Sequence, residues 1–155
     1  MKGHMGAWAL LGALALVSPA LADEGCEGAH AAGTSKLTVQ VSGVRSARGE
    51  VAITIYPDER RRFLAKGGKV ARVRLPAAAS VRACLWLPPA SYAVAIYHDV
   101  NADRDFNRTL VGLPAEGFGF SNNPETKVGL PPLSQTRFKL APGEGAISIQ
   151  MRYLR

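Results

Sequence analysis

Cysteine is scarce in this chain, which has 155 residues and only two cysteines, Cys26 and Cys84. Two cysteines alone cannot supply the ligands of a structural zinc site. In an oxidising compartment an isolated pair of cysteines is usually bridged. We therefore predict a Cys26–Cys84 disulfide for a chain that enters such a compartment.

Long apolar runs are scarce too, because the sequence has only one, over residues 7–17. This run is shorter than the roughly 20 residues that cross a bilayer. Lys2 precedes it, Pro19 follows it, and a small-x-small pattern ends at Ala22, as in a cleavable signal peptide. We predict a signal peptide over residues 1–22, no transmembrane anchor after its cleavage, and a periplasmic or secreted protein.

Acidic residues are fewer than basic ones, with 12 Asp and Glu against 19 Lys and Arg, so the net charge is +7. The basic residues are scattered rather than clustered with aromatic ones, which argues against a nucleic-acid surface. The excess of basic over acidic residues has two possible interpretations. Either the protein is attracted to anionic envelope components, or its solvated faces are charged for solubility.

The feature that the sequence does have is a hydrophobic period of two. Apolar and polar residues alternate over residues 37–43, 51–56, 70–75, 79–87 and 147–153, and residues 92–98 are apolar on both faces. This pattern predicts one all-β domain over residues 36–155, after an irregular lead-in of residues 23–35. The expected architecture is a β-sandwich of about seven strands, with a partly open barrel as the alternative.

Three local predictions accompany this architecture. Arg48-Gly49 is expected to form a hairpin turn, and Asp58 to cap one or two helical turns. Cys84 is expected to point away from the core, because its neighbours in the alternation are apolar. The lead-in that carries Cys26 would then lie across the outside of the sheet.

Oxygen-bearing side chains alternate after the strand at residues 92–98, and they are Asp99, Asn101, Asp103 and Asp105. Calcium takes six to eight oxygen ligands, and the spacing overlaps the start of an EF-hand loop. Arg104 and Leu110 stand where that loop needs its glycine and its bidentate glutamate. The segment is therefore either a weak calcium site or a polar turn in which Asp and Asn bond to nearby backbone.

Catalytic residues are not apparent, although His98, Asp99 and Glu116 are candidates for a hydrolase-type site. Such a site needs a nucleophile and a base within hydrogen-bond reach of each other, and no spacing in the sequence places them so. A non-enzymatic protein is the favoured interpretation, and the hydrolase is the alternative.

A second candidate site is an aromatic loop whose residues are Glu116, Phe118, Phe120, Asn122 and Asn123. The glycines between the two phenylalanines allow a tight backbone path. The rings could line a ligand surface carried on a rigid scaffold. They could instead plug one end of the sandwich, because two rings bury a large apolar area.

The run Tyr97-His98-Asp99, the Asp/Asn segment after it and the string Glu-Gly-Phe-Gly-Phe-Ser-Asn-Asn at residues 116–123 resemble a known signature. It is that of the domain of unknown function 2141 family (DUF2141), small exported bacterial proteins. The resemblance covers residues 36–152. It implies a signal peptide and an immunoglobulin-like or prealbumin-like β-sandwich, and it carries over no catalytic residue. We therefore expect an exported binding or accessory module of the cell envelope.

Overall fold

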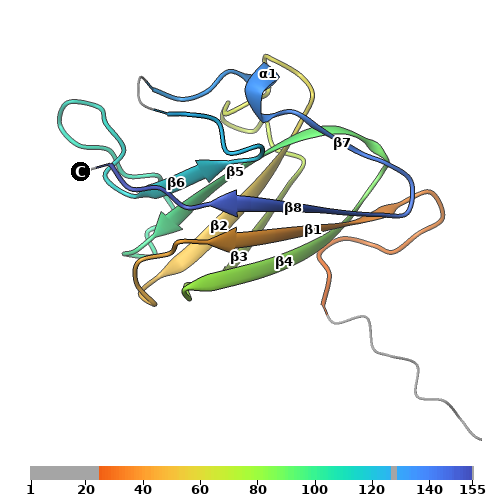
Figure 1. The fold of residues 1–155 in the computed structure, drawn as a ribbon, viewed down its shortest axis with the longest axis horizontal. Coiled ribbons are helices and arrows are strands. Elements are labelled where there is room, and N and C mark those ends of the chain that lie inside the picture. The colour runs from red at the N-terminus through yellow and green to blue at the C-terminus, as the bar shows by residue number, and fades with distance from the viewer. Residues whose placement is uncertain (1–24, 127–128, 155) are drawn as a thin grey trace, which may run out of the picture.

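A computed structural model describes residues 25–126 and 129–154, so the predicted signal peptide lies outside the described residues. The structure consists of strands and one short helix (Figure 1). The strands are β1 (Ser35–Ser42), β2 (Glu50–Pro57), β3 (Ala71–Pro76), β4 (Ser80–Leu87), β5 (Ala90–Asp99), β6 (Gly117–Phe120), β7 (Phe138–Leu140) and β8 (Glu144–Gln150). The helix α1 covers Leu133–Thr136.

The strands form two sheets that pack face to face (Figure 1). One sheet has the order β4-β1-β8, in which β1 and β4 are antiparallel and β1 and β8 are parallel. The other has the order β3-β2-β5-β6, and β7 also pairs with β5. This arrangement confirms the predicted β-sandwich.

The core lies between the sheets and comes from the predicted alternation. In β1, Leu37, Val39 and Val41 are fully buried, while the residues between them are partly exposed. In β2, Val51, Ile53 and Ile55 face the same core. Burial of each such side chain contributes about 1.5–3 kcal/mol, so the alternating pattern accounts for much of the driving force for this architecture.

The disulfide is present between Cys26 and Cys84, whose Cα atoms are 4.7 Å apart. The lead-in runs along the edge of β4, because the Glu27 N–H donates to the Cys84 carbonyl and the Trp86 N–H donates to the Glu27 carbonyl. The ring of His30 stacks on that of Trp86. The lead-in is thus paired with the edge of the sheet as well as stapled to it.

Cys84 is half-exposed between the buried Ala83 and Leu85, as predicted, but two other local predictions were wrong. Arg48-Gly49 is not a hairpin turn, because β1 and β2 belong to different sheets. Asp58 caps no helix: its carboxylate pairs with Arg137, and residues 60–64 form turns. No strand or helix was predicted between residues 98 and 147, where the structure has β6, α1 and β7. No helix in the described part of the chain is long and apolar enough to cross a membrane.

Candidate functional site

The outer face of the larger sheet carries a hollow that arises from the sizes of paired side chains. Across the strands, Thr54 pairs with Arg72 on one side and with Ala95 on the other, and Ala95 pairs with Phe120. The small residues of β2 and β5 thus stand between long or aromatic residues of β3 and β6. Because side chains directly opposite each other share one face, this register leaves a low floor between two higher walls.

Two loops raise the walls further. Residues 64–67 and Lys69, before β3, line one side, and Phe106 and Arg108, between β5 and β6, line the other. The resulting pocket has a volume of about 440 Å³, within the range of small-molecule sites. Five aromatic rings line it, and they belong to Tyr56, Tyr97, Phe106, Phe118 and Phe120.

The charge of the pocket is of one sign. Its charged lining residues are Lys66, Lys69, Arg72 and Arg108, and no carboxylate lines it among the described residues. The Nε of Arg72 donates to the Thr54 hydroxyl at 2.8 Å, which fixes the guanidinium beside the floor. Burial raises the pKa of Tyr56, and the charge of Arg72 partly offsets that rise. The pocket therefore combines an apolar interior with a positive potential.

The segment after β5 is held by Asp99, which is fully buried on the same outer face. Its carboxylate accepts hydrogen bonds from the backbone N–H groups of Asp103 and Arg104, at 3.1 and 2.9 Å, and pairs with Arg74 at 3.1 Å. Arg74 also donates to the Tyr97 hydroxyl at 2.7 Å. This network ties the loop to β3 and β5 and so fixes one edge of the pocket.

The side chains of Asp99, Asn101 and Asp103, three of the proposed calcium ligands, take part in hydrogen bonds within the loop. Asp103 accepts hydrogen bonds from the side chains of Asn101 and Asn107 and from the backbone N–H of Asp105. No group of three or more His, Cys, Asp or Glu residues in the described ranges could hold a metal ion. The geometry of Asp99, Asn101, Asp103 and Asp105 is that of a hydrogen-bonded polar turn.

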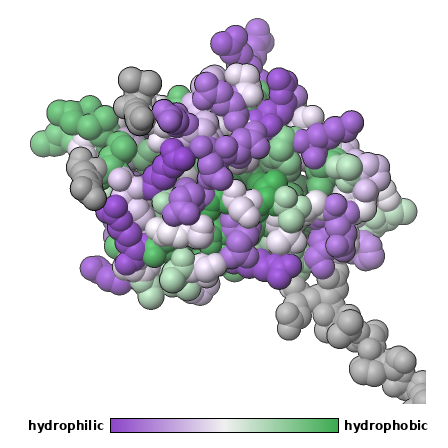
Figure 2. All heavy atoms as spheres, in the orientation of Figure 1, coloured by the Kyte–Doolittle hydropathy of each residue, from purple (hydrophilic) through white to green (hydrophobic). Residues whose placement is uncertain are grey.

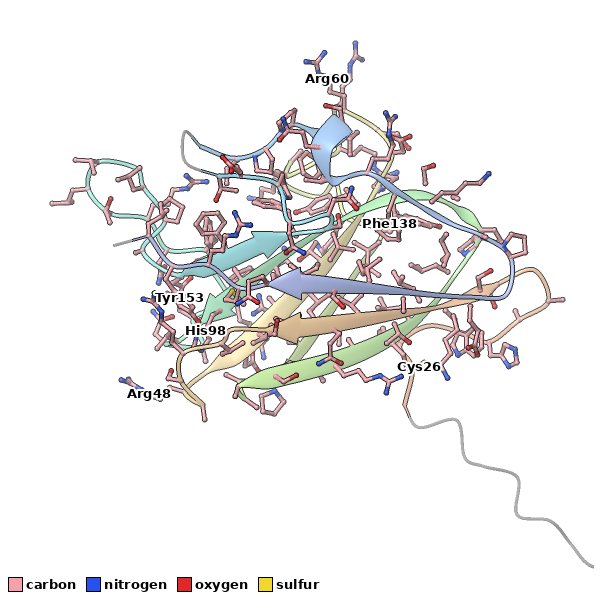
Figure 3. The ribbon with its side chains drawn as sticks, viewed as in Figure 1. Cys26, Arg48, Arg60, His98, Phe138 and Tyr153 are labelled. Carbon is pink, nitrogen blue, oxygen red and sulfur yellow. A yellow bond between two sulfur atoms is a disulfide. The ribbon has the colours of Figure 1, made fainter. Side chains whose placement is uncertain are left out.

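His98 and Asp99 point to opposite faces of the sheet, as adjacent strand residues must. The buried His98 ring bonds to the Tyr153 hydroxyl at 2.7 Å and to the Arg48 carbonyl at 2.8 Å (Figure 3). A carbonyl can only accept, so Nε2 carries a proton. Glu116 instead accepts hydrogen bonds from the N–H groups of Val100 and Asn107. The hydrolase candidates share no partner, and none of them lines the pocket.

The string at residues 116–123 performs several structural tasks. In β6, Phe118 and Phe120 turn toward the pocket and form a cluster with Ala52 and Tyr97 that is separate from the core between the sheets. They therefore do not plug the end of the sandwich. Gly117 and Gly119 face inward, where a Cβ on Gly119 would lie 2.7 Å from the Gln150 carbonyl oxygen.

The two asparagines after β6 fasten its end. The Asn122 side chain donates to the carbonyls of Gln135 and Arg137, and the Asn123 side chain bonds to the backbone of Ser148 and Gln150. Of the proposed ligand-loop residues, only the two phenylalanines line the pocket. Glu116, Asn122 and Asn123 hold the backbone that positions them.

Sequence reasoning missed Tyr56, Arg72 and Tyr97 as site residues. A signal was available, since residues 92–98 are apolar on both faces and a second apolar face requires a second cover. The aromatic residues on that second face indicate where the cover lies. The aromatic residues in the sequence could not reveal the hollow, because it depends on which residues pair across neighbouring strands.

These features define a class of protein: a small disulfide-bridged β-sandwich with an aromatic, basic pocket on the outer face of one sheet. The family described as "uncharacterized protein conserved in bacteria" (DUF2141) matches residues 39–148. The chain belongs to this family. Comparison with curated proteins and with solved structures finds no match.

Proposed function

We propose that this protein is an exported, non-enzymatic binding module of the cell envelope that holds a small amphipathic anion in the outer-face pocket. The observation that carries the proposal is the composition of the lining, five aromatic rings and four cations without a carboxylate. Apolar walls favour an apolar body, and the cations favour an acidic group on it. The N-terminal pattern and the disulfide support export, because structural disulfides persist in oxidising compartments.

Arg72 is the cation on which binding should depend most. It is half-buried and fixed by Thr54, and no ion pair with a carboxylate involves it in the described ranges. Charge-assisted hydrogen bonds from a guanidinium to an acid are stronger than neutral ones, and a partly buried site is less screened by salt. An anion that enters the pocket would supply an acidic partner for the guanidinium of Arg72.

The experiment compares two fluorescent probes with the same aromatic body, the anion anilinonaphthalene sulfonate and the neutral phenylnaphthylamine. The protein is used as the oxidised mature chain. We expect the anion to bind at least about tenfold more tightly, a difference of roughly 1.4 kcal/mol. Arg72→Met should remove this preference, and Phe118→Ala should weaken both probes.

The matched control is Arg82→Met, because Arg82 is exposed on β4 in the other sheet and its loss changes the net charge equally. Lys69→Met serves as a second pocket variant that removes an exposed cation. Equal effects of the Arg72 and Arg82 substitutions would show that only overall charge matters and would contradict the proposal. Failure of both probes to bind would contradict it as well.

A further inference from the structure

A second feature lies outside the pocket, in the loop between β5 and β6. Residues 107–115 fold back on themselves as a small hairpin, which we call the finger. Arg108 and Pro114 form a β-bridge, and the Ala115 N–H donates to the Asn107 carbonyl at 2.9 Å. At the turn, the Gly112 N–H donates to the Thr109 carbonyl at 2.8 Å. The finger is therefore a hairpin held by its own backbone hydrogen bonds.

The tip of the finger is apolar and turned to solvent. Leu110, Val111 and Leu113 are 108%, 80% and 54% exposed, more than any other large hydrophobic residue in the described ranges. In Figure 1 the loop projects beyond the sandwich near the C-terminal end, and Figure 2 shows a hydrophobic projection in the same place. Contiguous apolar groups exposed in this way mark contacts with a partner or a membrane.

The finger is flanked by charges of both signs on a chain whose net charge is +7. Arg108 stands in its stem and donates to the Gly112 carbonyl at 3.1 Å, and the exposed Arg104 precedes it. The exposed carboxylates of Asp103 and Asp105 in the preceding loop offset these two arginines locally. The attraction to an anionic bilayer therefore comes from the net positive charge of the whole chain, and the apolar tip adds to it.

We propose that the finger docks the protein on an anionic membrane surface. Leu110, Val111 and Leu113 enter the interfacial layer, and the exposed Arg104 contacts lipid phosphates. Such binding grows with buried apolar area and with attraction to anionic lipids, and it needs no shape complementarity. A protein partner is disfavoured because a stable interface buries about 800 Å² on each side around aromatic or arginine anchors. Three aliphatic side chains on a projecting turn do not provide such a surface.

Docking would also orient the pocket. Phe106 and Arg108 line the pocket and lead directly into the finger. A docked finger therefore brings that wall of the pocket close to the lipid surface. The docking proposal is independent of the pocket ligand, because the tip residues do not line the pocket.

The test is sedimentation of the oxidised mature chain with vesicles of phosphatidylcholine alone or mixed with phosphatidylglycerol. The tip variant is Leu110→Ser with Val111→Ser, and the control is Val70→Ser, at another exposed hydrophobic residue. We expect binding to the anionic vesicles that weakens with salt, a loss of at least about tenfold in the tip variant and no loss in the control. The tip variant should still bind the anionic probe in the pocket.

A second measurement reports insertion. In Leu110→Trp, the added tryptophan emission should shift to the blue with anionic vesicles and be quenched by brominated lipid tails. Wild-type protein that stays in the supernatant with every vesicle would overturn the proposal. So would equal binding by the tip variant, or self-association that the tip substitutions abolish, since the finger would then contact a second copy of the chain.

Discussion

At the scale of the residue, Glu116 shows how a buried carboxyl can serve the site without touching it. It is 7% exposed and accepts hydrogen bonds from the backbone N–H groups of Val100 and Asn107, 16 and 9 residues away in sequence. It thus joins both ends of the loop that supplies Phe106 to the pocket. Burial raises the pKa of Glu116, the two backbone N–H groups oppose the rise, and Asp99 and Asp103 add to it.

The raised pKa of Glu116 has a consequence for stability. The Glu116 carboxyl group holds its proton more tightly in the folded protein than in the unfolded chain. Its contribution to the free energy of unfolding therefore falls as the pH rises from about 4.3, the pKa of glutamate in the unfolded chain, to the higher pKa in the folded protein. In Glu116→Gln this dependence disappears. We expect the difference in free energy of unfolding, wild type minus variant, to decrease over that interval and then level off.

Urea denaturation followed by circular dichroism between pH 4 and pH 7 would measure this difference. Because both proteins have the same other carboxylates, the contributions of these groups to the pH dependence cancel in the difference. Glu116→Ala is the companion variant and should cost about 1–3 kcal/mol at neutral pH, because two buried N–H groups lose their acceptor. A wild-type minus Gln difference that does not change with pH would contradict the argument.

The polar turn at residues 99–107 leads to a second prediction at this scale. The carboxylates of Asp99 and Asp103 accept hydrogen bonds within the loop, and that of Asp99 also pairs with Arg74. We expect calorimetric titration of metal-stripped protein with calcium to give no saturable heat at low millimolar concentration, whereas Asp99→Ala should lower the free energy of unfolding by about 1–3 kcal/mol. Saturable calcium binding that Asp103→Ala removes would restore the metal interpretation.

At the scale of the element, β6 divides its two faces between two tasks. Its phenylalanines cover the pocket, and its glycines allow close approach to β8 and the C-terminal segment. A Cβ on Gly117 would lie 2.4 Å from the ring of Tyr153, and one on Gly119 would lie 3.0 Å from the side chain of Ile149. The Gly-Phe-Gly-Phe order is thus an alternation of small inward and large outward residues.

We expect Gly119→Ala to displace β6, because the added methyl group would meet the Gln150 carbonyl oxygen at 2.7 Å and cannot be accommodated by side-chain motion alone. Overpacking of this kind costs about 1–3 kcal/mol. Thermal unfolding and binding of the anionic probe should both be impaired, since Phe118 and Phe120 move with the strand. A variant with unchanged melting temperature and unchanged probe affinity would contradict this account.

The elements also show what sequence could predict. Most of the long strands carry an alternation and β5 is apolar on both faces, and these patterns predicted the approximate ranges of β1 to β5, whereas the range predicted for the last strand lies three residues beyond β8. The strands β6 and β7 were missed because they have four and three residues, and the first is half glycine. The pocket was missed because it depends on the pairing of Thr54 with Arg72 and Ala95. Sequence patterns report the face of a residue, and they do not report its neighbour across the sheet.

At the scale of the whole molecule, the two sheets carry different features. The sheet β4-β1-β8 holds the disulfide and the lead-in, and the larger sheet carries the pocket and, between β5 and β6, the finger. The stapled edge is therefore separate from the proposed ligand and membrane surfaces. Stability and binding should respond to different substitutions.

The disulfide tests this separation. Cys26 and Cys84 are 58 residues apart, and the loop that they close contains β1, β2 and β3. In the chain-entropy model such a loop lowers the entropy of the unfolded chain by an amount worth about 4 kcal/mol at most. We expect Cys26→Ala with Cys84→Ala to lower the free energy of unfolding by about 2–4 kcal/mol and to raise the urea m-value, because the unfolded chain becomes less compact.

The folded double variant should retain its affinity for the anionic probe and for anionic vesicles, since neither surface includes β4 or the lead-in. Two hydrogen bonds between Glu27 and β4 remain to hold the lead-in in place. A free energy of unfolding within about 0.5 kcal/mol of the wild type would show that the closed loop adds little. Loss of probe binding by the folded variant would show that the two sheets are coupled, and it would contradict the separation of stability from binding.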